Sequence, residues 1–330
     1  MDWAALLAKF RDVRALVVGD ICLDRWCQYD PAEADLSHET GIPRLAVTES
    51  TETPGAGGTV ANNFASLGAR KVSVLGAIGQ DGFGFELERA LTRRGIDYSQ
   101  IVASPRMRTF TYTKLINKET GVEDRPRVDF INTKPLLGEV EDQLIANFHA
   151  VYGDYDVIVV SDQAETELGG VITPAFREVI ADVADRDKLV VVDSRRRIGL
   201  FRNALAKPNV REAEQACESL FGKSDLERLR QTIGNRPMVV TNGDRGAVLV
   251  AKDTLKRIPA VRLGEPVDTC GAGDAFAAAL ALALGAGADY ETAVRFANLV
   301  AGMTVMKAGT GTAAPAEVLA AADSLAKNEP

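Results

Sequence analysis

Short apolar runs alternate with helix-like stretches along most of the chain. Five such runs, at residues 15–20, 71–79, 156–162, 188–194 and 238–244, are short and β-branched, and each ends in Gly, Asp, Ser or Asn. Continuous apolar strands of this kind are buried on both faces, as in a parallel sheet covered by helices. Between them, helices are predicted at residues 60–67, 83–94, 171–184 and 272–284. This alternation predicts an α/β fold, a doubly wound α/β/α sandwich.

Two stretches break the alternation. Residues 44–53 and 109–131 alternate polar with apolar or β-branched positions and lack helical periodicity, and Lys118–Gly121 is typical of a hairpin turn. We expect a small antiparallel β-sheet outside the main one, with strands at about 40–53 and 108–131, that covers a site as a lid. Residues 1–330 are predicted to form a single domain in which these lid strands are inserted, and the Ala-rich tail 313–330 is predicted to form a terminal helix with a frayed end.

Composition narrows the function classes. The 330 residues are 46% hydrophobic and 25% charged, and 38 basic against 46 acidic side chains give a net charge of −8. An acidic balance argues against partners such as nucleic acid or an anionic membrane, because phosphates attract an excess of Lys and Arg. Four cysteines and two histidines lack the paired spacings of a zinc site. The most apolar run, residues 275–284, is half the length of a membrane span. The N-terminus does not resemble a signal peptide, so we expect a cytoplasmic protein.

The strongest chemical signal is the loop 268–274, Asp-Thr-Cys-Gly-Ala-Gly-Asp, which leads directly into a predicted helix. Small residues there expose consecutive backbone N–H groups at a helix N-terminus, where phosphate oxygens bind favourably. Asp274 lies in the first turn, placed to accept a proton from an attacking hydroxyl. The alternative is an ordinary Gly-rich loop whose aspartate caps the helix. The loop alone leaves both interpretations open.

Further motifs accompany this loop in a fixed order. They are Gly19-Asp20 with Asp24, the Gly-rich stretch 54–69, Gly76 to Gly84, Asn209 with Glu212, Thr241 to Gly246, and Asn298 with Lys307 to Thr310. Together with the Asp-Thr-x-Gly-Ala-Gly-Asp string they resemble the ribokinase-like (PfkB) family of carbohydrate kinases over nearly the whole chain. The resemblance implies a ribokinase-like sandwich with a lid, ATP and Mg²⁺ as cofactors, and phosphoryl transfer to a sugar hydroxyl.

The resemblance also assigns roles by position. Asp274 would be the base, and the amides of Gly271, Ala272 and Gly273 the anion hole for the moving phosphoryl group. Asn209 and Glu212 would organise Mg²⁺. The nucleotide side would comprise Asn209, Thr241, Gly243, Gly246, Asp268, Thr269 and Asn298. The sugar side would comprise Asp20, Asp24, Gly57, Gly58 and Asn62. The family's asparagine in the Gly-rich motif corresponds to Thr59 in one register and to Asn62 in another. A monovalent cation (K⁺) beside the Asp268 loop, common in the family, is a further expectation.

Three stretches, at residues 19–26, 36–47 and 111–130, resemble the group of this family that phosphorylates the anomeric hydroxyl of a heptose 7-phosphate. In that resemblance Lys114 and Arg127 neutralise the phosphate already on the substrate. Two departures stand out: residues 161–166 lack the group's lysine and carry an acid, and three consecutive arginines, 195–197, follow the next strand. Another sugar, a nucleoside, or a catalytically silent sensor on the same fold are the alternatives. Pairing of lid edges predicts a homodimer.

Overall fold

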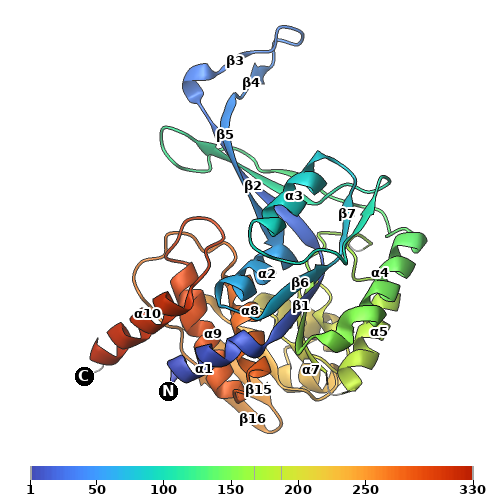
Figure 1. The fold of residues 1–330 in the computed structure, drawn as a ribbon, viewed down its shortest axis with the longest axis vertical. Helices are drawn as coiled ribbons and strands as arrows, with labels where there is room; N and C mark the ends of the chain where they lie inside the picture. The colour runs from blue at the N-terminus through green and yellow to red at the C-terminus, as the bar shows by residue number, and fades with distance from the viewer. Residues whose placement is uncertain (1, 167, 187, 329–330) are drawn as a thin grey trace.

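A five-stranded parallel sheet forms the centre of the molecule (Figure 1). The computed structural model describes residues 2–166, 168–186 and 188–328. The strand order is β13 (Leu205–Ala206), β12 (Leu189–Ser194), β11 (Val157–Asp162), β1 (Arg14–Gly19) and β6 (Lys71–Leu75). All neighbours run parallel. The strands predicted at the starts of four apolar runs are confirmed.

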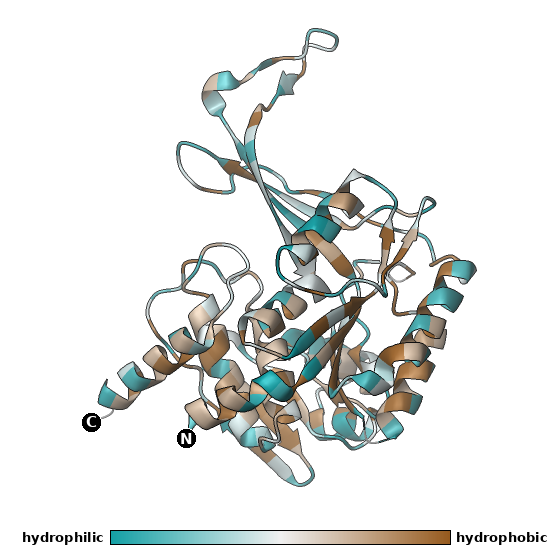
Figure 2. Cartoon of the chain, viewed as in Figure 1, coloured by the Kyte–Doolittle hydropathy of each residue, from teal (hydrophilic) through white to brown (hydrophobic). Residues whose placement is uncertain are grey.

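Helices cover both faces of this sheet because successive strand side chains point to opposite sides. Val17 and Val159 belong to one buried cluster, and Leu16 and Ile158 to the other. The first cluster packs against α1 (Trp3–Lys9), α2 (Gly57–Ser66), α3 (Gly82–Thr92), α8 (Ala272–Gly285), α9 (Tyr290–Thr304) and α10 (Pro315–Asn328). The second packs against α4 (Gly138–Val151), α5 (Pro174–Asp185), α6 (Val210–Phe221) and α7 (Leu226–Thr232). Apolar colour follows the central strands and α8 in Figure 2.

Two sequence-based expectations are corrected. The run 71–79 forms two strands, because the chain leaves the main sheet after β6 and β7 (Ala77–Gly79) pairs with β8 (Val102–Ser104) instead. The last apolar run, β14 (Met238–Thr241), is not a parallel strand. It pairs antiparallel with β15 (Ala247–Ala251), which pairs with β16 (Thr254–Ile258). The connection from β14 to β15 is too short for the crossover that a parallel pair needs.

A second sheet protrudes from the sandwich and comprises β10 (Val128–Phe130), β9 (Thr111–Asn117), β2 (Ile21–Tyr29) and β5 (Val47–Ala56), in that order. We call it the protruding sheet. Strand β2, directly after β1, was not predicted, and it pairs along its length antiparallel with β5 and parallel with β9. The expectation of a purely antiparallel sheet is therefore wrong, because the unpredicted strand separates the two predicted ones. Beyond it, the small hairpin of β3 (Asp35–Leu36) and β4 (Pro43–Arg44) forms the tip of the arm in Figure 1. The predicted turn follows β9, where Gly121 has φ +70° and its N–H donates to the Asn117 carbonyl.

No helix in residues 2–166, 168–186 and 188–328 is long and apolar enough to cross a membrane.

Candidate active site

The loop before α8 is held in a fixed shape by its own residues. Gly271 is the N-cap of α8 with φ +76°, a conformation that favours glycine, and an added Cβ would lie 3.1 Å from Thr310. The Asp268 carboxylate accepts hydrogen bonds from the N–H groups of Cys270 (2.8 Å) and Gly309 (3.1 Å). The loop therefore presents the first amides of a buried helix at a defined place.

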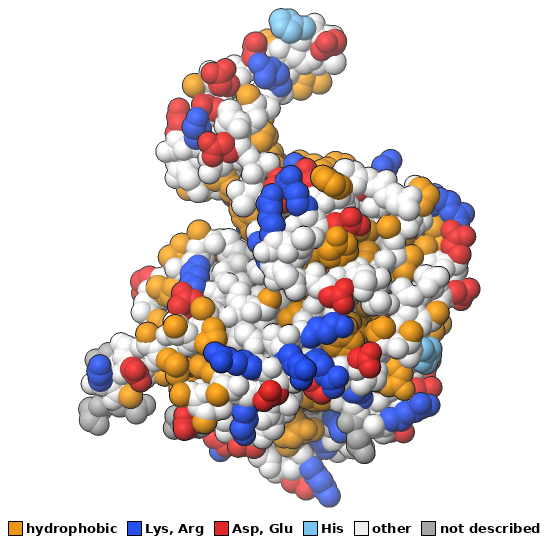
Figure 3. Space-filling view, in the orientation of Figure 1, with side chains coloured by type: hydrophobic (Ala, Val, Ile, Leu, Met, Phe, Trp, Pro, Cys, Tyr) orange, Lys and Arg blue, Asp and Glu red, His pale blue; other side chains and the backbone are white. Residues whose placement is uncertain are grey.

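Two cavities lie on either side of this helix N-terminus. Gly271 and Asp274 line a cavity of about 160 Å³, which we call the small cavity. Thr269, Ala272 and Gly273 line one of about 510 Å³, the large cavity. The molecule is hollowed where the protruding sheet leaves the body (Figure 3). A group that passes from one cavity to the other meets the amides at the start of α8 and the Asp274 carboxyl group.

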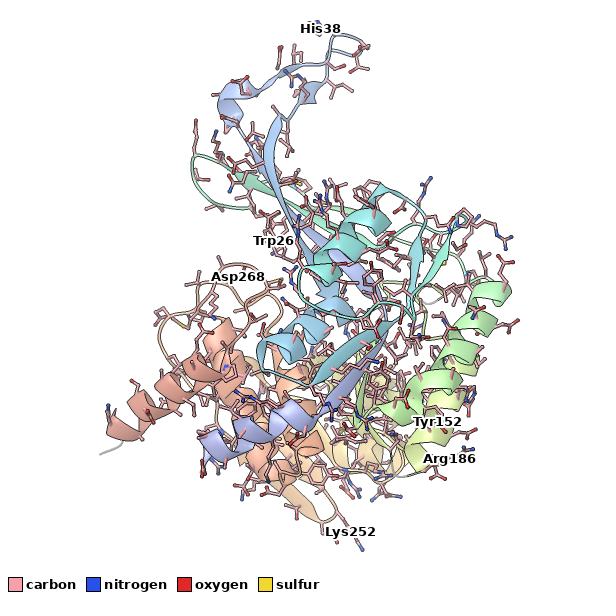
Figure 4. All side chains as sticks on the ribbon, viewed as in Figure 1. Trp26, His38, Tyr152, Arg186, Lys252 and Asp268 are labelled. Carbon is pink, nitrogen blue, oxygen red and sulfur yellow. The ribbon has the colours of Figure 1, made fainter. Side chains whose placement is uncertain are left out.

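The small cavity is bounded by both the protruding sheet and the body. Its lining comprises Asp24, Arg25, Trp26, Ala56, Thr59, Tyr112, Lys114, Arg127, Gln163, Arg195, Cys270, Gly271, Asp274 and Thr310. Gly309, whose N–H donates to the Asp268 carboxylate, packs against β2: a Cβ added to Gly309 would lie 3.5 Å from the Trp26 ring. Figure 4 shows Trp26 and Asp268 near each other, where the protruding sheet meets the body. Four lining side chains are cationic and two are carboxylic acids.

Asp274 is partly buried at the wall of the small cavity, and this burial raises its pKa to about 8. The Asp193 carboxylate, the next cause, raises the pKa further, and the Lys207 ammonium opposes it. Lys207 is itself buried and forms an ion pair with Asp193 at 3.1 Å. A carboxyl group whose pKa lies near neutrality is suited to accept a proton during catalysis.

Asp24 projects from β2 into the same cavity. Burial raises the pKa of its carboxyl group to about 7, while Lys114 and Arg127 lower it. The Asp24 carboxyl group packs against Gly55 of the neighbouring strand β5. A Cβ at position 55 would lie 2.2 Å from Asp24 Oδ1, so a larger residue there would displace the carboxyl group. Asp24 and Asp274 are thus two desolvated carboxyl groups on one small cavity.

The large cavity gathers most residues predicted for the nucleotide. Thr241, Gly243, Gly246, Thr269 and Asn298 all line it. The Asn298 side-chain amide donates to the carbonyls of Ile258 (3.3 Å) and Pro259 (3.0 Å), so it fixes the wall of the cavity after β16. The remaining lining is largely apolar: Val261, Leu263, Phe276, Ala301, Val305 and Met306. A largely apolar cavity beside helix amides matches the base and phosphates of a nucleotide.

The sequence profile described as pfkB family carbohydrate kinase matches residues 15–317. The chain belongs to this family. It is a carbohydrate kinase, an ATP-dependent phosphotransferase with an alcohol group as acceptor. The family's use of ATP and Mg²⁺ agrees with the large cavity beside the helix amides.

Curated relatives and solved structures extend the match. The bifunctional protein HldE of Geobacter metallireducens is 33% identical over 324 residues, which cover 96% of this chain and 64% of that protein. HldE of Caulobacter vibrioides is 34% identical, covering 99% and 67%. The chain thus spans about two thirds of the length of these relatives. The fold is ribokinase-like: Thermotoga maritima ribokinase aligns with TM-score 0.69 (23% identity, 94% and 99% covered). Escherichia coli phosphofructokinase-2, solved in complex with potassium, aligns with TM-score 0.72 (18% identity, 95% and 99%).

Several residues predicted for the sugar side of this kinase do not line the small cavity. The buried Asp20 carboxylate accepts hydrogen bonds from the N–H groups of Gln163 (2.8 Å) and Val171 (2.9 Å), so it holds the segment after β11. Gly57 and Gly58 are buried in the first turn of α2, where the Gly57 N–H donates to the Asp20 carbonyl.

Thr59 and Asn62 differ in their position relative to the small cavity. Thr59 lines the small cavity and donates its hydroxyl to the Pro54 carbonyl at 3.2 Å. Asn62 lies one helical turn further along and does not line it. The structure therefore favours the register that places the family's asparagine at Thr59, and a contact between Asn62 and the sugar stays a prediction.

Asn209 and Glu212 bind each other. The Asn209 side chain accepts from the Glu212 N–H at 2.9 Å, and the Glu212 carboxylate accepts from the Asn209 N–H at 2.8 Å, which is a capping box at the start of α6. Burial and Asp193 raise the pKa of Glu212. Asn209 thus positions Glu212, and its oxygen is occupied by the helix.

The three consecutive arginines have three different environments. Arg195 lines the small cavity, Arg196 is exposed, and Arg197 forms an ion pair with the buried Asp162. The sequence reasoning did not single out Tyr112, Trp26, Arg25 or the Asp193–Lys207 pair. Asp193 did carry a signal, because it stands at the carboxyl end of a predicted strand, where ligands bind in such sheets.

Proposed function

We propose that this kinase phosphorylates a sugar that already carries a phosphate group, and that the acceptor is the anomeric hydroxyl of a heptose 7-phosphate. The observation that supports the proposal is the charge of the small cavity. Arg25, Lys114, Arg127 and Arg195 line it against two carboxyl groups whose pKa values are raised to about 7 and about 8. The acids that pair with these four cations, Glu86, Glu123, Asp129 and Glu165, lie outside the lining. The cavity wall itself is therefore richer in cations than in acids, which favours an anionic sugar.

The size of the cavity agrees with one sugar ring. Its volume of about 160 Å³ is close to that of a protein cavity of about 150 Å³ that holds benzene. Thr59 and Asp24 supply hydroxyl and carboxyl partners for the ring hydroxyls. Lys114 and Arg127, both from the protruding sheet, are the cations that the family resemblance assigns to the substrate phosphate. In this proposal the protruding sheet acts as the lid.

Phosphoryl transfer then runs across the start of α8. ATP occupies the large cavity with its phosphates at the amides of Gly271, Ala272 and Gly273, and the sugar occupies the small one. Asp274 takes the proton of the sugar hydroxyl as the oxygen bonds to the γ-phosphorus. The bond from that phosphorus to the β,γ-bridging oxygen breaks, and ADP is released. The helix amides stabilise the charge on the moving group, since the positive end of the helix dipole points at it.

The residues around Lys207 fit a magnesium ion that enters with the nucleotide. Asp193, Glu212 and Asp274 interact electrostatically with this one ammonium, so negative charge is in excess there. Within the described residues, no three Cys, His, Asp or Glu side chains form a group that could hold a metal by themselves. Glu212 and Asp193 would hold the ion together with ATP phosphates, since Mg²⁺ in kinases is shared with its substrate. When bound, it would neutralise phosphate charge. A monovalent cation near Asp268 stays a prediction.

We also propose that two chains pair through the outer end of the protruding sheet, formed by the β3–β4 hairpin and the edge strand β5. The outer edge of β5 has no strand partner in the sheet order, and Leu36, Ile42 and Val47 near it are 54%, 65% and 48% exposed. An unpaired edge with exposed apolar side chains favours association with a second copy.

The decisive experiment is ADP release from Mg·ATP over a panel of sugars, nucleosides and sugar phosphates that includes heptose 7-phosphate. Asp274→Asn is the control for the chemical step. We expect turnover on heptose 7-phosphate that the substitution lowers by roughly 10² to 10⁴. Turnover on unphosphorylated sugars or nucleosides alone would refute the proposed acceptor and leave the kinase assignment in place.

A further inference from the structure

A third acid lies just outside the small cavity, beside one of its cations. Glu165, in the segment between β11 and α5, accepts a hydrogen bond from Arg195 and forms an ion pair with it. The Tyr112 hydroxyl donates to the same Glu165 oxygen at 3.4 Å. Arg195 lines the small cavity, whereas Glu165 does not. The guanidinium group therefore bridges the cavity and an internal carboxylate.

Arg195 differs from the other cations of the cavity in where it comes from. Lys114 lies on β9, and Arg127 lies just before β10, where its guanidinium stacks on the Tyr112 ring at 4.8 Å and pairs with Asp129. Arg195 instead follows β12 of the main sheet. The Tyr112 ring stands between the two arginines, since it contacts Arg127 through its face and Glu165 through its hydroxyl.

We propose that Arg195 is the specificity-determining residue for the substrate phosphate, and that Glu165 is an internal anion that this phosphate replaces. The inference rests on the proposed function and deepens it. Without a substrate, Glu165 pairs with Arg195 beside the cavity. A bound sugar phosphate replaces Glu165 as the partner of the Arg195 guanidinium group. The phosphate then links Arg195, which follows a strand of the main sheet, to Lys114 and Arg127 of the protruding sheet.

The exchange is favourable because the two anions are unequal. The Arg195–Glu165 pair is partly exposed, with side-chain exposures of 40% and 29%, and pairs of this kind contribute little stability. A phosphate monoester carries nearly two negative charges near neutral pH and accepts two parallel hydrogen bonds from a guanidinium group. An unphosphorylated sugar cannot displace Glu165, so the pair discriminates against it.

The test compares KM for heptose 7-phosphate and for the unphosphorylated heptose in four variants. Arg195→Gln removes the cation, and Arg195→Lys keeps its charge but loses the planar fork. Glu165→Gln keeps an acceptor for Arg195 but removes the competing charge. Arg196→Gln is the matched control, because Arg196 is exposed in the same loop. Calorimetric binding of heptose 7-phosphate without ATP gives a second readout that does not depend on turnover.

We expect Arg195→Gln to raise KM and Kd for heptose 7-phosphate by about 10- to 100-fold, with KM for ATP unchanged and a smaller loss in Arg195→Lys. Glu165→Gln should lower KM for the phosphorylated sugar several-fold and leave the unphosphorylated one unchanged. Arg196→Gln should match the wild type. A preference for the phosphorylated sugar that survives Arg195→Gln, or an equal loss in Glu165→Gln, overturns this inference alone. A wild type without that preference refutes the proposed acceptor, and the inference falls with it.

Discussion

Replacement of Asp274 by asparagine should stabilise the protein while it inactivates it. The folded-state pKa of Asp274 is raised by burial, and further by Asp193, from an ordinary value of 3.8 to about 8. Between these two values the folded state holds a proton that the unfolded state has released. The unfolding free energy of the wild type therefore falls as pH rises through this window, by about 1.4 kcal/mol for each pH unit. Asparagine is uncharged at every pH and lacks this loss.

The magnitude follows from the same window. Between pH 5 and pH 8 the excess in unfolding free energy of Asp274→Asn over the wild type should grow by roughly 4 kcal/mol at most. The full span of the window corresponds to roughly 5 to 6 kcal/mol, and the folded-state value of about 8 already includes the opposing effect of Lys207. Above pH 8 the difference should level off.

The assay is urea unfolding of the ligand-free protein at pH 5, 6.5, 8 and 9. Asp289→Asn is the matched control, because Asp289 caps α9 by accepting from Thr292 N–H and its pKa is lowered. A lowered pKa gives a stabilisation that is complete above the unfolded value, so the Asp289 difference should be constant from pH 5 to 9. A difference for Asp274→Asn that is equally constant would refute the argument that the empty site holds this carboxyl group in its neutral form.

Three further outcomes test the surroundings of the site. The acid limb of kcat/KM against pH should move to lower pH in Asp193→Asn, because this change removes a negative charge next to Asp274. It should move to higher pH in Lys207→Met, which removes a positive charge. Shifts of both variants in the same direction would contradict these electrostatic roles. Gly271→Ala should cost about 1 kcal/mol or more in urea unfolding and lower kcat, since φ is +76° and Thr310 lies in the way; unchanged kcat would show that the loop tolerates movement. Ile42→Asp should shift sedimentation toward monomer, and an unaltered dimer would place the interface elsewhere.

The parts of the site that depend on local sequence could be predicted. The loop before α8 needs small residues and a left-handed glycine, and both are visible in the sequence as Cys270-Gly271-Ala272-Gly273. The central strands could also be predicted, because a strand that is buried on both faces needs a continuous run of apolar residues. The helix predicted at residues 83–94 likewise has a local signal, because Asp81 caps it by accepting from the Gly84 N–H at the start of α3.

The parts that depend on tertiary contacts could not be predicted in the same way. Asp20 and Asp24 stand four residues apart beside one strand junction, yet Asp20 turns to backbone amides of the segment after β11 and Asp24 turns to the cavity. Arg195 and Arg197 differ because Asp162 is buried under the latter and Glu165 lies beside the former. The environment of each of these side chains is determined by residues that are distant in the sequence. Periodicity within one segment carries no information about them.

The position of Asp274 joins stability to function. A carboxylate in water has a pKa too low to be an effective base near neutral pH, and burial is the change that raises it. The same burial makes the charged form costly for the fold, so catalytic competence at this position requires a local loss of stability. Lys207 limits that loss because its ammonium group favours the charged Asp274, whereas Asp193, whose effect is the larger of the two, increases it. Removal of either partner should therefore change activity through the pH at which Asp274 ionises, before it changes how the sugar is bound.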